Sequence, residues 1–290
     1  MKAKRFWENT IHGFFLLMGL ITVGCVLLIT VYLIISGIPA IREIGLIKFL
    51  FGPVWDSNGT PPQFGILSFI LTSVYGTAGA ILLGVPLGFM TAVFLAKMAP
   101  AKLKAVVSSA VSLLAGIPSV VYGLVGMLVL VPGIRKIFHI PDGSGLLAAI
   151  IVLAIMILPS IINVAMTSLE AVPREYEDAS LALGASAVET FFRVSVPAAK
   201  SGIAAAVVLG VGRAIGEAMA VMMVAGNVAN MPSLFQSVRF LTTAVASEMS
   251  YSSPGSLQRN ALFSIALVLF LFIMLLNAAL NFFLKRDKEK

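Results

Sequence analysis

The charged residues of this chain are separated by long stretches that contain no Asp, Glu, Lys or Arg. Five such stretches cover residues 13–41, 57–96, 105–134, 143–169 and 260–284. A helix needs about 20 apolar residues, each rising about 1.5 Å, to cross the hydrocarbon core of a bilayer. With a sixth apolar region around residue 210, the pattern predicts helices at 14–36, 67–96, 105–131, 146–169, 203–226 and 260–284.

The overall composition supports a bilayer as the solvent. Hydrophobic residues make up 59% of the 290 residues and charged residues only 11%, whereas a soluble domain carries about 25% charged residues. The sequence therefore predicts an all-α integral membrane protein with six transmembrane helices. A single Cys rules out a disulfide framework, and two distant His residues leave a metal site almost nothing to build from.

The basic residues predict the orientation of the chain. Six crossings place both termini on one side, and thirteen of the twenty Lys and Arg residues lie in the termini, the 97–104 turn and the 170–200 loop, against six on the other side. The positive-inside rule makes the richer side cytoplasmic. Topology thus accounts for the net charge of +7 without a nucleic-acid partner. The predicted organisation is a cytoplasmic N-terminus at 1–13, a membrane domain at 14–284 and a cytoplasmic C-terminus at 285–290. The first apolar run is too long for a cleaved signal peptide and reads as a retained anchor.

The 170–200 loop has a helical composition interrupted by Gly184, which predicts two short helices about a glycine bend. Its apolar residues are too many for a loop that faces only water, so part of it packs on its own helices or on a partner protein. Pro197 is expected to end the second half before the fifth span begins. The apolar residues are Ala179, Leu183, Val188, Phe191, Phe192 and Val194.

Arg213 and Glu217 are the ionisable residues placed deep in a predicted span, and their spacing of four puts them on one face of a continuous helix. Each costs about 2.5–3.5 kcal/mol at a membrane helix centre, so the pair is expected to face a bundle interior or an aqueous path. A structural ion pair and a transport role both remain open. A guanidinium donates two parallel hydrogen bonds to an oxyanion such as phosphate or sulfate. Glu217 would neutralise Arg213 in an empty path and accept a hydrogen bond from a protonated phosphate oxygen.

Small residues and prolines add weaker signals. Gly84 with Gly88, and Gly212 with Gly216, are spaced for close helix packing. The runs 116–119 and 159–160 are expected to break the third and fourth spans. Trp55 is expected to anchor at the outer interface, and Glu248 lies in the long outward segment.

One stretch of the loop resembles a known motif. Asp178-Ala179-Ser180, three residues, Gly184, nine residues and then Val194-x-Val196-Pro197 is similar to the EAA loop of ATP-binding-cassette importer permeases. The resemblance implies the type I ABC importer permease fold and a coupling helix that docks on a cytoplasmic ATPase subunit. The chain itself has no phosphate-binding loop of the Gly-x-x-x-x-Gly-Lys-Ser/Thr type, so another subunit binds the ATP and no cofactor is expected here.

A longer resemblance covers most of the chain. The run 212–221, the following Val224-Ala-Gly-Asn227, and the runs 51–55, 114–119 and 182–185 are similar to PstC-type permeases of phosphate importers. The resemblance implies a bacterial inner membrane, a second permease of PstA type, a PstB-type ATPase dimer, a PstS-type phosphate-binding protein and inorganic phosphate as the substrate. In this interpretation the chain is not itself an enzyme.

Three other functions compete with this one. A permease for another oxyanion, such as sulfate or molybdate, would keep the coupling loop and differ near Arg213. A secondary transporter or channel would use the Arg/Glu pair without ATP but has no need of the EAA spacing. A membrane-embedded enzyme lacks a metal cluster or an evident Ser/His/Asp arrangement in the sequence.

Overall fold

The computed structural model describes residues 2–286 and is almost entirely helical. The prediction for 287–290, the end of the C-terminal segment, lies outside the described residues. The helices are α1 (Lys2–Ile44), α2 (Leu46–Phe51), α3 (Leu67–Val93), α4 (Ala101–Gly116), α5 (Ser119–Val125), α6 (Val131–Phe138), α7 (Leu146–Glu170), α8 (Arg174–Ala182), α9 (Ala187–Thr190), α10 (Val196–Ala198), α11 (Lys200–Gly216), α12 (Met219–Val224), α13 (Leu241–Glu248) and α14 (Leu257–Arg286). Three π-helical segments, η1 (Phe94–Met98), η2 (Gly126–Leu130) and η3 (Phe191–Ser195), and a 3-10 turn, η4 (Met249–Tyr251), join them. Strands β1 (Trp55–Asp56) and β2 (Gln63–Phe64) form an antiparallel pair in which Trp55 faces Phe64.

The predicted spans correspond to helices that are long and apolar enough to cross a membrane, except that the third is displaced. It begins at Ser119 and not at residue 105, because the first part of the predicted 105–131 helix belongs to α4, a separate helix of 16 residues. Five of the spans are Thr10–Ile44, Leu67–Met98, Ser119–Phe138, Leu146–Glu170 and Leu257–Ala279. The sixth, Lys200–Gly216, passes the same test together with the preceding helical run, from which it is bent by 70°. The all-α membrane fold is therefore confirmed.

The third span is broken where the sequence predicts. The chain is extended at Ile117 and Pro118, so α4 ends at Gly116 and α5 begins at Ser119. The predicted break at Pro159 is wrong, because α7 continues from Leu146 to Glu170 with Pro159 inside it. The 18-residue apolar window of α7 is 61% buried within the chain, and packing of this kind holds a membrane helix together around a proline.

The fifth span is not one helix over 203–226, as the sequence predicts. Helix α11 ends at Gly216, Glu217 is extended with φ −75° and ψ 123°, and α12 starts at Met219. The Thr242 hydroxyl donates a 2.9 Å hydrogen bond to the Glu217 carbonyl oxygen. This contact ties the broken backbone to α13 and satisfies a carbonyl that the helix no longer uses.

Close packing of α3 and α11 on α7 builds the centre of the molecule. A Cβ at Gly84 would lie 2.7 Å from the Ile157 side chain, and one at Gly88 would lie 2.9 Å from Ile161, so the predicted role of this glycine pair is confirmed. A Cβ at Gly212 or Gly216 would meet nothing within 4 Å. No described helix of this chain therefore packs tightly on that second pair.

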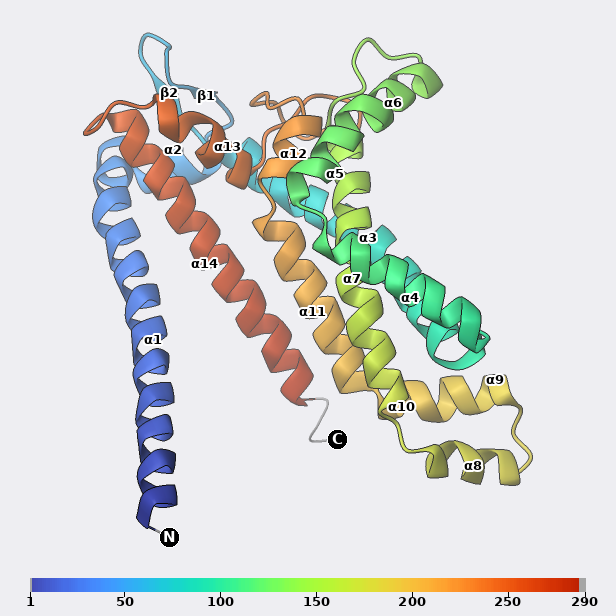
Figure 1. The fold of residues 1–290 in the computed structure, drawn as a ribbon. Coiled ribbons are helices and arrows are strands. Elements are labelled where there is room, and N and C mark those ends of the chain that lie inside the picture. The colour runs from blue at the N-terminus through green and yellow to red at the C-terminus, as the bar shows by residue number, and fades with distance from the viewer. Residues whose placement is uncertain (1, 287–290) are drawn as a thin grey trace.

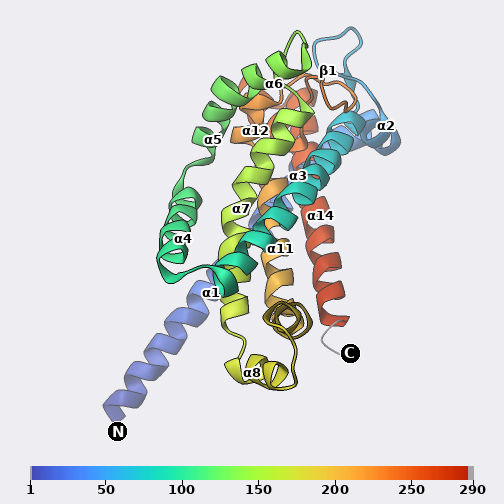
Figure 2. The same cartoon turned by 90° about the vertical axis from the view of Figure 1, so that its right-hand side faces the viewer.

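The two ends of the molecule differ in structure (Figure 1). Helices α8, α9 and α10 lie at one end, which is also the end where the described chain begins and where α14 finishes. The opposite end carries α2, the two strands, α6, α12 and α13. In Figure 2, α4 stands to the left of α7, and the first part of α1 extends away from the bundle at the lower left. Within the chain α1 is joined mainly to α14, where the Ser264 hydroxyl donates to the Gly37 carbonyl at 2.6 Å.

Candidate coupling segment and translocation site

The segment between the fourth and fifth spans contains the predicted glycine bend. Helices α8 and α9 are separated by a turn in which Gly184 has φ +87°, a conformation that favours glycine. The turn is closed by a capping box, since the Ser186 hydroxyl accepts the Glu189 backbone N–H and the Glu189 carboxylate accepts the Ser186 backbone N–H. A 2.9 Å hydrogen bond between the Ser180 and Thr190 hydroxyls joins the two halves. The prediction of two helices about Gly184 is therefore confirmed.

The Glu177 carboxylate attaches this segment to the membrane helices. It pairs with the Lys97 ammonium group in η1 and accepts a 2.7 Å hydrogen bond from the Ser195 hydroxyl in η3. Partial burial acts to raise the pKa of Glu177, but the hydrogen bonds from Lys97 and Ser195 and the charges of Lys97 and Arg174 outweigh it, so the pKa lies below its usual range. One carboxylate thus links α8 to the end of the second span and to the run that leads into the fifth.

Pro197 does not end the second half of the segment. The preceding residue, Val196, keeps helical angles of φ −64° and ψ −48°, and α10 continues through Pro197 to Ala198. The π-helical turn η3 directly before it changes the hydrogen-bond register, which removes the need for a donor at proline. The 70° bend comes at Ala199, where α11 begins one residue later. The prediction for Pro197 was wrong because it assumed an ordinary α-helix.

The apolar residues of the segment divide into a buried and an exposed set. Phe191 is 4% exposed and packs in a cluster with Val93, Leu169 and Val172 at the base of the second and fourth spans. Leu183 is 90% exposed, Val188 53% and Phe192 46%. The segment therefore packs on its own helices through one face and exposes apolar side chains on the other. Packing on its own helices is confirmed for Phe191, and packing of the exposed residues on a partner protein stays a prediction.

The residues of the EAA-like motif lie on the outer side of this segment. Asp178 and Ala179 are exposed on α8, and Ser180 is half-buried by its contact with Thr190. A cavity of about 500 Å³ lies beside Asp178 and is lined by the charged residues Lys97, Lys104, Glu170, Arg174 and Glu177. The polar edge and the apolar surface lie next to each other at the end of the bundle.

Arg213 lies within the fifth span and is half-buried. Its Nη1 donates a 3.2 Å hydrogen bond to the Ser160 hydroxyl of α7, and its charge acts electrostatically on Tyr122 of α5. Among the described side chains, the ion pairs are formed by Lys97, Lys104 and Arg239, and Arg213 takes part in none of them. Its guanidinium is held by a neutral hydroxyl, which leaves its positive charge without a carboxylate partner within 4 Å in the described region.

Glu217 is not the counter-ion that the sequence predicts. Its Oε1 accepts a 3.0 Å hydrogen bond from the Ala220 backbone N–H in the first turn of α12. A spacing of four residues places two side chains on one face only if the helix is continuous. Here α11 ends at Gly216, between Arg213 and Glu217, so the two side chains do not share a helix face. Glu217 therefore stabilises the break between α11 and α12, and the Arg213–Glu217 ion pair is absent from the described contacts.

A partly buried polar cluster at the opposite end is not predicted by the sequence. Glu248 pairs with Arg239, and its carboxylate accepts hydrogen bonds from Trp55 Nε1 at 3.2 Å and from Gln258 Nε2 at 3.1 Å. Arg239 also donates through Nε to the Asn227 carbonyl at 2.9 Å. Trp55 is only 7% exposed, so it is a core residue and not an interfacial anchor. Sequence gave no signal for this contact because Trp55 and Glu248 are 193 residues apart.

Within the described residues, the structure combines five to six candidate membrane spans, a two-helix segment at one end, and Arg213 inside the bundle without a carboxylate partner. This is the architecture of a helical multi-pass membrane protein. Residues 84–287 match the model of a family described as the inner membrane component of binding-protein-dependent transport systems. The chain belongs to this family of transporter permease subunits, whose members work with a substrate-binding protein and a separate ATPase subunit.

Curated relatives extend the match over most of the chain. A probable ABC transporter permease protein of Bacillus subtilis, YqgH, is 39% identical over 89% of this chain and 86% of its own length. The phosphate transport system permease protein PstC of Haemophilus influenzae is 34% identical over 83% of this chain and 82% of its own length. The PstC protein of Mesorhizobium japonicum is also 34% identical, over 82% of this chain and 78% of its own length.

Solved structures agree at the level of the fold. An inward-facing MetNI methionine ABC transporter chain superposes with a TM-score of 0.59 at 19% identity, covering 77% of this chain and 97% of that one. A chain of an amino acid ABC transporter gives a TM-score of 0.54 at 22% identity, over 76% and 92% of the two chains. The fold is therefore that of type I ABC importer permeases, and the chain is a permease subunit, not the ATPase.

Proposed function

We propose that this chain is the PstC-type permease subunit of an ATP-driven importer of inorganic phosphate. The names of several relatives that are 30–34% identical support phosphate as the substrate. The observation that carries the proposal in this chain is the half-buried Arg213, which is held by the Ser160 hydroxyl and has no carboxylate partner in the described region. A guanidinium with donors to spare is suited to a tetrahedral oxyanion.

Three types of partner complete the proposed transporter. They are a PstA-type permease, a PstB-type ATPase dimer that alone binds the ATP, and a PstS-type phosphate-binding protein. The start of α1, the end of α14 and the α8–α10 segment lie at one end of the molecule (Figure 1), and the positive-inside rule supports a cytoplasmic location for that end in a bacterial inner membrane. The α2, β1–β2 and α13 end then faces the binding protein.

The α8–α9 pair transmits the movement of the ATPase in this proposal. Leu183 and Val188 provide the apolar contact, and Asp178, Ala179 and Ser180 with the Gly184 bend and Pro197 shape the segment that carries it. Because α10 runs through Pro197 to the 70° bend before α11, a displacement of α9 acts on the fifth span directly. Arg213 lies on that span, so its access to each side changes with the ATPase state.

The phosphate contact at Arg213 has to be weak, since a tightly held anion would leave slowly. Ser160 serves this purpose by competing for the guanidinium when no anion is present. Glu217 retains one carboxylate oxygen that can accept a hydrogen bond from a protonated phosphate oxygen, which fully ionised sulfate lacks. This would favour phosphate over sulfate or molybdate, the alternative substrates. The comparisons give no support to an ATP-independent secondary transporter.

ATP hydrolysis by the complete complex in lipid nanodiscs, with its binding protein, tests the proposal. We expect phosphate to stimulate hydrolysis while sulfate and molybdate do not, and we expect Arg213→Gln to abolish the stimulation with the complex still assembled. Arg42→Gln, which removes an exposed cation near the end of α1, is the matched control and should behave as the original chain. Stimulation by another oxyanion alone would replace the substrate, and full stimulation of Arg213→Gln would remove Arg213 from the path.

A second variant addresses Glu217. Glu217→Gln keeps an oxygen for the Ala220 N–H, so the break between α11 and α12 is expected to survive, while the acceptor for a protonated anion is weakened. We expect the preference of transport for phosphate over sulfate to fall. If phosphate and sulfate handling are both unchanged, Glu217 has no part in selectivity and acts only on the backbone break.

A further inference from the structure

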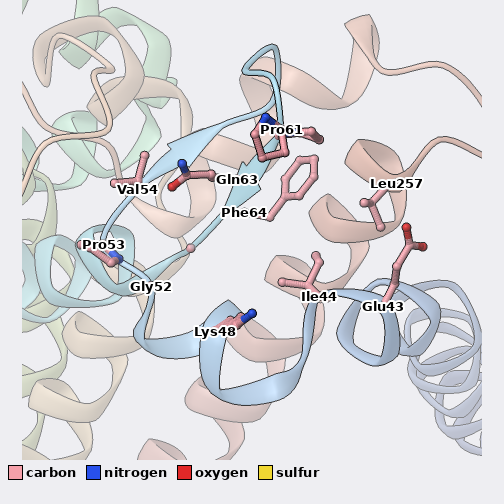
Figure 3. A pocket seen from close by; sticks show the side chains of 12 residues that line it. Glu43, Ile44, Lys48, Gly52, Pro53, Val54, Pro61, Gln63, Phe64 and Leu257 are labelled. Atoms are coloured by element: carbon pink, nitrogen blue, oxygen red, sulfur yellow. The ribbon is translucent and has the colours of Figure 1, made fainter.

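A preformed cavity lies at the end of the molecule opposite α8, where α1 meets the β1–β2 hairpin. It has a volume of about 520 Å³. Figure 3 shows its wall, with Glu43 and Lys48 on either side of Ile44, and Phe64 and Leu257 completing the apolar part. The transport mechanism proposed above does not use this cavity.

The floor of the cavity is fixed by the backbone. A Cβ at Gly65 would lie 2.4 Å from the Gly52 carbonyl carbon, so the two glycines allow their strands of chain to touch. Hydrogen bonds from Gly65 N–H to the Val54 carbonyl at 2.8 Å and from Leu67 N–H to the Gly52 carbonyl at 3.1 Å hold this crossing. The Phe64 ring is 5% exposed and meets Trp55 edge-to-face at 5.3 Å. Backbone contacts and aromatic packing therefore hold the floor and one wall of the cavity in place.

The cavity lies at the end of a helix whose exposed apolar surface is suited to contact with lipid. It opens at the end of α1, and the most apolar window of that helix has none of its residues buried within the chain. Large apolar side chains such as Leu28 (69% exposed) and Ile35 (68% exposed) cover this helix. Glu43 lies in the last turn of α1 and Lys48 in α2, and charged residues that follow an apolar helix are suited to the headgroup region of a bilayer.

The wall carries one exposed carboxylate and one exposed ammonium group, with apolar side chains between them. An anion alone would be repelled by Glu43, and a cation alone by Lys48. A ligand with a phosphate and a primary ammonium group on a short linker meets both charges, because Lys48 pairs with the phosphate and Glu43 accepts N–H donors from the ammonium. A glycerol backbone and the start of an acyl chain suit Ile44, Phe64 and Leu257.

We propose that this cavity binds the headgroup of phosphatidylethanolamine from the outer leaflet. The charge pattern predicts a ranking among phospholipids. Phosphatidylglycerol lacks the ammonium group for Glu43, and the quaternary ammonium of phosphatidylcholine has no N–H to donate. The cavity thus selects a zwitterionic lipid with a primary amine, at the outer end of the helix that has least packing within the chain.

The assembled complex, reconstituted in nanodiscs with equimolar phosphatidylethanolamine, phosphatidylglycerol and phosphatidylcholine, tests this site by native mass spectrometry of retained lipid. We expect phosphatidylethanolamine to be retained preferentially. Glu43→Gln is expected to remove the preference over phosphatidylcholine, and Lys48→Gln to lower phospholipid retention about three-fold, the effect of one charge pair at an exposed site. Arg42→Gln, an exposed cation that does not line the cavity, is the matched control and should leave retention unchanged.

A variant that reverses the charge at position 43 tests for a change in the preferred lipid and not only for a loss of binding. Glu43→Lys places a second cation at the wall and is expected to switch the preference to phosphatidylglycerol. Retention of phosphatidylethanolamine that neither Glu43→Gln nor Lys48→Gln alters would overturn the proposal, as would an unchanged preference in Glu43→Lys. If soluble phosphoethanolamine competed with the lipid as well as phosphatidylethanolamine itself does, the proposal of a ligand from the bilayer would also be overturned. Crosslinks from Lys48 to the binding protein in place of lipid would overturn it too, and would assign the cavity to protein docking.

Discussion

Lys97 and Glu177, eighty residues apart, form an ion pair that fastens α8 to the end of the second span. The Ser195 hydroxyl donates to the same carboxylate, and Lys97 and Ser195 each lie in a π-helical segment. The carboxylate therefore joins two places where the helical register changes. It connects α8 to the second span through Lys97 and to the run before the fifth span through Ser195 in η3.

Replacing Glu177 should weaken this connection. Glu177→Gln leaves the Lys97 ammonium, with a side chain that is 20% exposed, without its counter-charge. We expect a loss of about 1–2 kcal/mol in stability and reduced stimulation of the ATPase by the binding protein, with subunit assembly retained. Glu175→Gln, an exposed carboxylate two residues earlier in α8, is the matched control. Equal behaviour of the two variants would show that the ion pair has no role in coupling.

The lowered pKa of Glu177 predicts that the stability of the chain depends on pH. Because its pKa in the folded chain lies below the ordinary value of 4.5, its stabilising contribution is fully present above that value and is lost as the pH falls through the lowered pKa. Thermal unfolding of the original chain and of Glu177→Gln should therefore differ at pH 7 and converge in the acid range below the ordinary pKa. A difference that persists unchanged into that range would mean that packing, not charge, separates the two proteins.

The exposed apolar surface of the coupling segment should hold the ATPase subunit. Leu183 is 90% exposed and follows directly after α8, so Leu183→Ser costs the isolated chain little. We expect it to lower the amount of ATPase subunit that co-purifies, by about ten-fold for a central apolar contact. Phe138→Ser, at the opposite end and 48% exposed, should retain the ATPase. Normal co-purification of Leu183→Ser would place the interface elsewhere.

Alanine substitution should lower the stability of the chain at the first glycine pair and leave it nearly unchanged at the second. Gly84→Ala forces a Cβ to 2.7 Å from Ile157, and overpacking of this kind costs about 1–3 kcal/mol. Gly212→Ala meets nothing within 4 Å in the chain, so the fold should tolerate it. Thermal unfolding of the isolated subunit measures both, and Ile157→Val should restore part of the loss in Gly84→Ala. A Gly84→Ala variant as stable as the original chain would contradict the close packing of α3 on α7.

The Arg239–Glu248 pair should carry much of the stability of the outer end. Their side chains are 17% and 18% exposed, and Glu248→Ala would leave Arg239 partly buried without a counter-charge. We expect a loss of about 2–3 kcal/mol, somewhat below the 3–5 of a fully buried pair. Removing both charges in Arg239→Met/Glu248→Leu should recover part of it. Thermal unfolding followed by Trp55 fluorescence in a Trp7→Phe background reports on this region, and a double variant less stable than Glu248→Ala would contradict the argument.

The spans and the glycine bend could be predicted because each depends on local sequence. A charge-free window fixes a crossing, and Gly184 marks a backbone conformation that other residues avoid. The break after Gly216 could not be predicted because the hydrogen bond to the Glu217 carbonyl comes from Thr242 of α13, which is distant in sequence. The contacts of Arg213 and Glu177 could not be predicted for the same reason, since their partners lie on other helices. The prediction that a helix ends at Pro197 was wrong because a π-helical turn changes the hydrogen-bond register just before the proline. The sequence has no plain signal for such a turn.

The attachment of α1 to α14 determines the order in which the protein can be completed. The contact between Gly37 and Ser264 joins residues 227 positions apart, and the apolar window of α1 has no buried residue of its own. At a synthesis rate of about 5–20 residues per second, the first helix waits roughly 10–45 s in the bilayer before its partner emerges. During synthesis α1 therefore enters the bilayer without this partner, and its packing within the chain is completed only when α14 follows.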